Sequence, residues 1–220
     1  GDFRRLYEFL VSHYEAVISI SLSARVSGTY SAAVTAAQRV DGGRVRVIDS
    51  GNVSLGQGLL AMHAAERALA GDTANQVEAA VQRARPRIKT YALLARVDYA
   101  VRGGRVPPFV KTLATWLRFS PVLHTAPDGR VVLCGVIWGR HRLRERFARF
   151  MARRTDPRES HRLLIGHGNA ESEARQLSDE LKACIANVDS SHVTPLGTAL
   201  GVHGGPGMLV VGIERRPDSP

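Results

Sequence analysis

The chain has 220 residues, of which 44% are hydrophobic and 23% charged, and its formal net charge is +10. These proportions are ordinary for a globular protein, and the length allows one large core or two smaller ones. No apolar run is long enough to cross a bilayer, so we expect no stable membrane insertion and a cytoplasmic location. Cys134 and Cys184 form no Cys-x-x-Cys pair, which argues against a disulfide framework or a zinc clip.

The positive charge is the one feature that favours a nucleic-acid-binding module. It is nearly all arginine, since lysine occurs only at Lys89, Lys111 and Lys182. The arginines are spread along the chain with few aromatic residues between them. We therefore interpret them as solvated surface residues and predict no nucleic acid partner. A nucleic-acid-binding module would instead show an affinity for DNA or RNA that falls steeply with salt.

The first half of the chain predicts a small α/β domain that opens with an amphipathic helix at Phe3. Alternating, β-branched residues predict parallel strands at 17–22 and 45–49, joined by a helix at 31–40 in a βαβ unit. Capping boxes, in which Ser or Thr is followed three residues later by Gln, are predicted at 54–57 and 73–76. They open helices expected at about 55–70 and 74–84.

The second half predicts an α+β domain with hairpins, and we place the boundary so that the domains are residues 1–86 and 87–220. A turn at Pro127-Asp-Gly129 indicates a hairpin, and Pro195 indicates an edge strand. A ligand is expected in a cleft between the domains. Strands are predicted at 90–95, 122–125, 131–138, 162–166, 193–196 and 208–213, and helical segments at 99–102, 110–117, 143–151 and 171–185.

A hydroxyl-rich segment, residues 21–33 (SLSARVSGTYSAA), lies between the first predicted strand and its helix. Ser27 and Thr29 supply hydroxyl donors there, and Gly28 allows a ligand to approach the backbone. The N–H groups that begin a helix lack intrahelical partners and its dipole is positive, so this corner suits an anion. Ser27 also fits the helix N-cap position, and the two interpretations are compatible.

Two glycine-flanked histidines are further candidates for a functional role. Residues 201–207 (GVHGGPG) place His203 in a turn that precedes a strand, where a histidine is either structural or functional. Residues 166–168 (GHG) lack the full dinucleotide fingerprint, and we interpret them as a tight turn with Asn169 as the helix cap.

The other histidines and the basic residues favour structural roles. His124, His167 and His192 lie in strand patterns, and no three histidines have metal-ligand spacing with a carboxylate, so we predict no metal. A basic face formed by Arg142, Arg146, Arg149 and Arg153 is interpreted as a solvated helix surface.

Residues 21–33 resemble the signature of the DegV family of bacterial fatty-acid-binding proteins. Nearly the whole chain shares this resemblance, which implies a two-domain α/β fold with a parallel βαβ N-terminal domain and an α+β C-terminal domain with hairpins. Further matching segments follow in the family's order at 46–50, 54–60, 87–91, 97–106, 120–124, 139–140 and 201–207.

The family also has a first strand, an Asp-Ser-Thr turn and a Thr-Ser-Gln-Pro motif before the segment that matches Phe3. None of these occurs in this sequence, which begins at Gly1 without methionine. We therefore expect a truncated or processed DegV protein whose first domain lacks the family's N-terminal strands.

The resemblance implies a lipid-binding carrier without a cofactor. It would hold a long-chain fatty acid between its domains, with the carboxylate at Ser27, Gly28 and Thr29. It would present the acid to a separate fatty acid kinase, in support of phospholipid synthesis. The histidine that matches His203 lies near the ligand head group in the family and is linked to phosphoryl transfer, and Arg140 would face the kinase or the acyl-phosphate head.

An enzyme is the alternative that remains open. A serine-dependent esterase or acyl hydrolase would use Ser27 as nucleophile and His203 as base. Ser27 lacks the Gly-x-Ser-x-Gly elbow, and the sequence pairs no aspartate with a histidine in a catalytic pattern.

Overall fold

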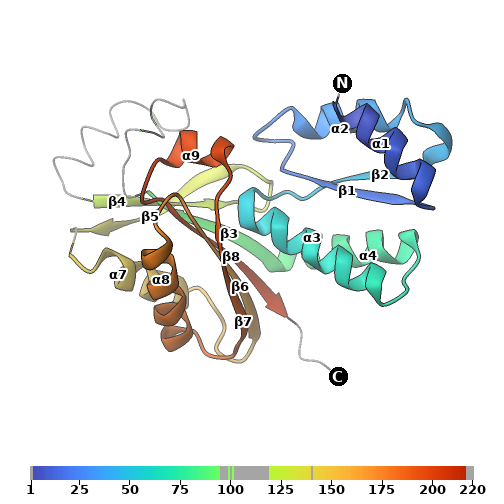
Figure 1. Ribbon diagram of the computed structural model, residues 1–220. Helices are drawn as coiled ribbons and strands as arrows, with labels where there is room; N and C mark the ends of the chain where they lie inside the picture. Colours follow the sequence, from blue (N-terminus) through green and yellow to red (C-terminus); the bar gives the residue numbers. More distant parts are fainter. Residues whose placement is uncertain (1, 95–98, 100, 102–118, 140, 217–220) are drawn as a thin grey trace. The chain divides into compact units, whose positions relative to one another are not determined.

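The computed structural model describes residues 2–94, 99, 101, 119–139 and 141–216 (Figure 1). Its contacts divide the chain into two compact units, Gly1–Ile88 with Thr125–Val131, and Lys89–His124 with Val132–Pro220. The helix predicted at 110–117 lies outside the described residues, as does the end of the helical turn predicted at 99–102.

The first unit is built on a parallel two-stranded sheet, and the connection of its strands through a helix confirms the predicted βαβ unit. Figure 1 shows α1 and α2 on one side of this sheet and α3 and α4 on the other. Tyr7 and Val11 of α1 and Ala33 of α2 are buried in one hydrophobic cluster, against which Val17 and Val47 of the strands pack. The elements are α1 (Asp2–His13), β1 (Val17–Ser21), α2 (Thr29–Ala37), β2 (Val45–Asp49), α3 (Ser54–Leu69), α4 (Ala74–Ala84) and 3-10 turns at Asp41–Gly43 and Arg85–Arg87.

One of the two predicted capping boxes forms. The Thr73 hydroxyl accepts from the backbone N–H of Gln76, whose side chain accepts in return from the N–H of Thr73. The box predicted at 54–57 is wrong, because Ser54 has a left-handed φ of 51° and makes no cap bond. The Gln57 amide instead donates to the carbonyl of Ile20 at 2.9 Å, a bond to a neighbouring strand that outweighs the local one.

The second unit contains a mixed six-stranded sheet among the described residues, in the order β5-β4-β3-β8-β6-β7. Strand β7 lies at an edge, which confirms the position predicted from Pro195. Helices α7 and α8 cover one face, where Phe147, Met151 and Leu177 are fully buried (Figure 1). The elements are β3 (Ile88–Leu93), β4 (Phe119–Thr125), β5 (Val131–Trp138), α7 (Leu143–Ala152), β6 (Ser160–His167), α8 (Glu171–Cys184), β7 (Val188–Pro195), α9 (Thr198–Gly204) and β8 (Leu209–Arg216).

Strands β4 and β5 form the predicted hairpin. The N–H of Ala126 donates to the carbonyl of Arg130 at 2.8 Å, and Gly129 takes the left-handed φ of 84° that closes the turn. The tip of this hairpin, Thr125–Val131, belongs to the first unit by its contacts.

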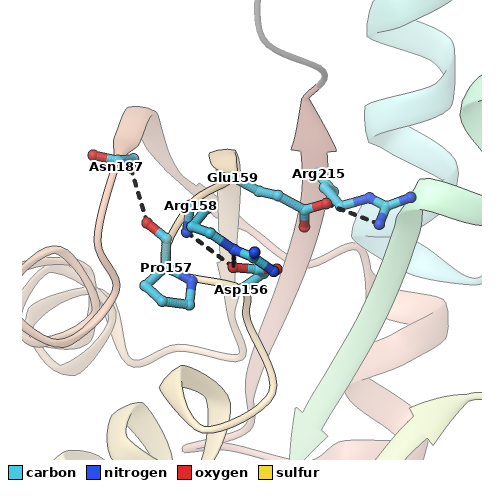
Figure 2. A network of polar contacts seen from close by, with 6 residues as sticks. All are labelled: Asp156, Pro157, Arg158, Glu159, Asn187 and Arg215. Carbon is cyan, nitrogen blue, oxygen red and sulfur yellow. Dashed lines mark hydrogen bonds and ion pairs between the residues drawn. The ribbon is translucent and has the colours of Figure 1, made fainter.

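A network of polar contacts links two connecting segments of the second unit to strand β8 (Figure 2). Before β6, the guanidinium of Arg158 bonds both carboxylate oxygens of Asp156, at 2.8 and 3.1 Å. Asn187, between α8 and β7, donates to the carbonyl of Pro157, and Arg215 of β8 donates to Glu159 at 2.9 Å. These bonds anchor the end of the sheet at which β6 begins.

Asp156 should titrate well below a normal aspartate. Hydrogen bonds from the side chain and backbone of Arg158 lower the pKa of Asp156 from 3.8 to about 2. Because this pKa is depressed in the folded protein, the contact stabilises the fold above pH 3.8 and is lost as the pH falls towards 2. NMR titration of Asp156 should show this pKa, and Arg158→Gln should return it towards 3.8. The matched variant Arg175→Gln, in an exposed pair with Glu171, should leave it unchanged. A normal pKa in the unmodified protein would show that Arg158 does not bond Asp156 in solution.

Candidate functional site

The loop after β1 carries the predicted anion-binding residues, and two short-range hydrogen bonds shape its first part. The N–H of Val26 donates to the carbonyl of Ser23 at 3.1 Å, and the N–H of Arg25 donates to the Ser23 hydroxyl at 3.2 Å. These bonds fold residues 23–26 into a tight turn, and Ser27 follows directly. The turn therefore sets the position of the Ser27 backbone, from which its side chain extends.

Ser27, Gly28 and Thr29 come together at the first turn of α2. The hydroxyls of Ser27 and Thr29 lie 2.8 Å apart, and the N–H of Thr29 donates to the Ser27 oxygen at 3.2 Å. The N-cap position belongs to Gly28, so the interpretation of Ser27 as the N-cap is wrong by one residue. Since helix α2 begins at Thr29, these hydroxyls lie at its positive end, as the anion-binding interpretation requires.

The two hydroxyls leave a proton available for a ligand. Only one hydrogen can occupy the line between the oxygens of Ser27 and Thr29, so the other hydroxyl can donate elsewhere. Both side chains are half-buried, and Gly28 between them is exposed. A Cβ atom at Gly28 would have no heavy atom within 4 Å, so the space beside its backbone is open.

Asp49, at the end of β2, helps to hold this loop and was missed in the sequence. Its Oδ1 atom accepts from the N–H of Gly51 at 2.8 Å and from the N–H of Ala24 at 3.4 Å. One carboxylate thus links the turn after β2 to the loop after β1. The sequence signal was weak, because an Asp that follows a strand is common and its partner at Ala24 lies 25 residues away.

His203 belongs to the second unit and lies in helix α9, which was not predicted. The turn expected at 201–207 is wrong in its first half, since residues up to Gly204 are helical. Among the described residues, Nδ1 of His203 is enclosed by protein yet has no hydrogen-bond partner.

The backbone beside His203 approaches other segments closely. Gly205 has a left-handed φ of 70°, and a Cβ atom there would overlap the ring of Tyr99. The N–H of Gly207 donates to the carbonyl of Gly168 at 2.8 Å, which ties the end of α9 to the loop after β6. The Asn169 cap predicted in that loop is wrong, because Ala170 is the N-cap and its N–H donates to His167 Nδ1.

The remaining candidates add little to the site. Arg140 lies outside the described residues. In the basic face behind it, Arg142 and Arg149 both pair with Glu145, and Arg146 donates to the carbonyl of Trp138. His124, His167 and His192 lie in strands as predicted.

Within the described part of the chain, no group of three or more His, Cys, Asp or Glu residues could hold a metal ion. No helix in the same residues is long and apolar enough to cross a membrane. Among the residues that the structure describes, the partners of the Ser27 hydroxyl are the hydroxyl and N–H of Thr29, and neither is a base that could activate a serine nucleophile.

Comparison with known proteins decides the family. A model described as "Uncharacterised protein, DegV family" matches residues 1–216. The chain belongs to the DegV family. Protein DegV of Bacillus subtilis is 30% identical over 214 residues, covering 95% of this chain and 74% of that protein. A DegV domain-containing protein of Streptomyces coelicolor is 29% identical, with 97% of this chain and 74% of the relative covered. The chain spans about three quarters of the length of these relatives.

Solved DegV structures confirm the mixed α/β fold. A DegV family protein of Thermus thermophilus, described by its fatty acid binding, is 29% identical with a TM-score of 0.86, covering 98% of this chain and 76% of its own. DegV of Bacillus subtilis, described as a fatty acid binding protein, is 27% identical with a TM-score of 0.78 and the same coverage. A Thermotoga maritima protein with reported fatty acid binding is 26% identical with a TM-score of 0.84, covering 98% and 75%.

The close approach at Gly205 leads to a prediction that needs no ligand. Gly205→Ala should lower Tm clearly, because the new methyl group overlaps the ring of Tyr99 and strains a left-handed backbone. Gly197→Ala is the control, since a Cβ atom there would meet no heavy atom within 4 Å. Thermal unfolding of both variants makes the comparison, and equal Tm values would mean that Tyr99 does not pack on Gly205.

Proposed function

We propose that this protein binds a long-chain fatty acid, with its carboxylate at Ser27, Gly28 and Thr29, and presents it to a separate fatty acid kinase. Membership of the DegV family carries the proposal, because relatives that are 26–29% identical and share the fold are described as fatty acid binding proteins. The hydroxyl pair at the start of α2 supports it, since a carboxylate accepts hydrogen bonds from such donors.

The two ends of the ligand contribute differently. Each buried methylene of the tail contributes about 0.8 kcal/mol, so a long tail supplies most of the affinity. One hydrogen bond to a charged carboxylate contributes about 1.5–3 kcal/mol, and its geometry sets the orientation of the head group. We therefore assign Ser27 and Thr29 an orienting role in the complex.

His203 and Arg140 are proposed to act on the head group rather than to hold the tail. The enclosed and unpartnered Nδ1 of His203 supports a role in which it bonds the acid or its phosphorylated form. Arg140 is proposed to contact the kinase or the acyl phosphate. Phosphorylation would convert the carboxylate into an acyl phosphate at the expense of ATP held by the kinase.

Native mass spectrometry of the protein purified from bacteria tests binding directly. A bound fatty acid, or uptake of added palmitate or oleate, would support the proposal. A protein that carries no lipid and takes up neither acid would overturn it. The serine hydrolase alternative predicts instead that a fluorophosphonate probe labels Ser27, and ester turnover that is lost in Ser27→Ala would favour it.

Ser27→Ala should weaken palmitate binding by about one to two orders of magnitude without abolishing it, because one hydrogen bond is lost while the tail remains buried. Titration with a fluorescent or isotopically labelled fatty acid measures the change in Kd. Thr35→Ala is the matched control on the same helix, since its exposed hydroxyl donates to the carbonyl of Ser31 at 2.9 Å. Equal Kd values for Ser27→Ala and the control would remove Ser27 from the site.

His203→Ala should have the opposite profile. Palmitate should remain bound, while acyl phosphate formed with ATP and a bacterial fatty acid kinase should fall. His13→Ala, which changes an exposed histidine of α1, serves as the control. Loss of binding together with unchanged acyl phosphate formation per bound ligand would contradict the role assigned to His203.

A further inference from the structure

Ser23 is completely buried at the carboxyl end of β1, although it is a small polar residue. All of its polar groups have partners: its N–H donates to the carbonyl of Asn52, its carbonyl accepts from Val26, and its hydroxyl oxygen accepts from the N–H of Arg25. Two of these bonds define the turn that leads into Ser27. A shift of Ser23 would therefore move the Ser27 hydroxyl.

Gly129, at the tip of the β4–β5 hairpin, packs directly on Ser23. A Cβ atom at Gly129 would overlap the Ser23 hydroxyl oxygen and would lie 3.5 Å from the Cα atom of Gly51. Gly51 belongs to the turn that Asp49 links to the loop after β1. The tip thus closes against both loops within the first unit.

We propose that Ser23 and Gly129 are positioning residues, which together hold the Ser27 hydroxyl where it selects a carboxylate. This inference rests on the proposed function, because it assigns the head-group selectivity of that same site. Ser23 supplies the bonds that shape the turn, and Gly129 supplies a backbone surface without a side chain that keeps the Ser23 hydroxyl in place. Neither residue needs to touch the ligand.

The turn can be tested without any ligand. Gly129→Ala should speed amide hydrogen exchange at residues 24–29 of the free protein, because the new methyl group displaces the Ser23 hydroxyl. Gly71→Ala is the matched control: its φ of 89° carries similar strain, but no heavy atom lies within 4 Å of its Cβ position. Unchanged exchange at residues 24–29 in Gly129→Ala would overturn the proposal, whether or not the protein binds a fatty acid.

Head-group selectivity is the second measurement, taken as the ratio of the Kd for methyl palmitate to the Kd for palmitate. Gly129→Ala should reduce this ratio about tenfold, towards the value for Ser27→Ala, because the hydroxyl no longer meets the carboxylate. Gly71→Ala should keep the ratio of the unmodified protein. An unchanged ratio in Gly129→Ala would overturn the positioning role. If the unmodified protein binds neither lipid, the proposed function is wrong, and the hydrogen-exchange result alone then decides whether Gly129 shapes the loop.

Ser23→Ala keeps the proposal testable if Gly129→Ala fails to fold. It removes the bond to Arg25 without adding bulk, and it should raise exchange at residues 24–29 and lower the selectivity ratio. Ser178→Ala is its control, since that serine is also buried and loses one bond, to Ser191. Equal selectivity ratios for the two serine variants would count decisively against Ser23 as a positioning residue.

Discussion

Polar groups at the carboxyl ends of β1 and β2 are buried, and each needs a hydrogen-bond partner inside the protein. Ser50 and Asn52, which are 0% and 4% exposed, meet this need for each other: the Ser50 hydroxyl donates to the Asn52 carbonyl and accepts from the Asn52 N–H. The side-chain amide of Asn52 donates to the carbonyl of Ile88, and the backbone carbonyl of Asn52 also accepts from the N–H of Ser23. The two loops therefore form one hydrogen-bonded structure, and the position of Ser27 depends on it.

Local patterns in the sequence were sufficient for several elements whose ends neighbouring residues decide. The helix at 74–84 has a complete capping box and was predicted with its observed bounds, as was the strand at 45–49. Prediction failed where a distant partner outweighs the local one. The Gln57 side chain donates to the carbonyl of Ile20 in β1 and does not form the predicted capping box. Helix α9 forms in a glycine-rich segment that ends where Gly205 packs closely on Tyr99.

The site was only partly visible in the sequence for the same reason. Ser27, Gly28 and Thr29 are adjacent, so a motif between a strand and a helix was enough to bring them together. Asp49 and Ser23 act through contacts with residues far along the chain, which no spacing rule can reveal. The buried pair of Arg162 and Glu214 is a parallel case, because these charges meet only through the register of β6 and β8.

A rigid loop is well suited to recognising a carboxylate when the tail supplies most of the affinity. A tail gains free energy in any apolar environment, so it discriminates poorly between an acid and its ester. Discrimination requires a donor whose direction is fixed before the ligand arrives, because a donor that must first be ordered loses part of the bond energy to entropy. Because the hydroxyls of Ser27 and Thr29 share one hydrogen bond, one hydroxyl proton remains for a ligand, and the buried bonds of Ser23 shape the turn that precedes Ser27. Under the proposed function, selectivity would therefore depend on the packing of the loop as much as on the hydroxyls of Ser27 and Thr29.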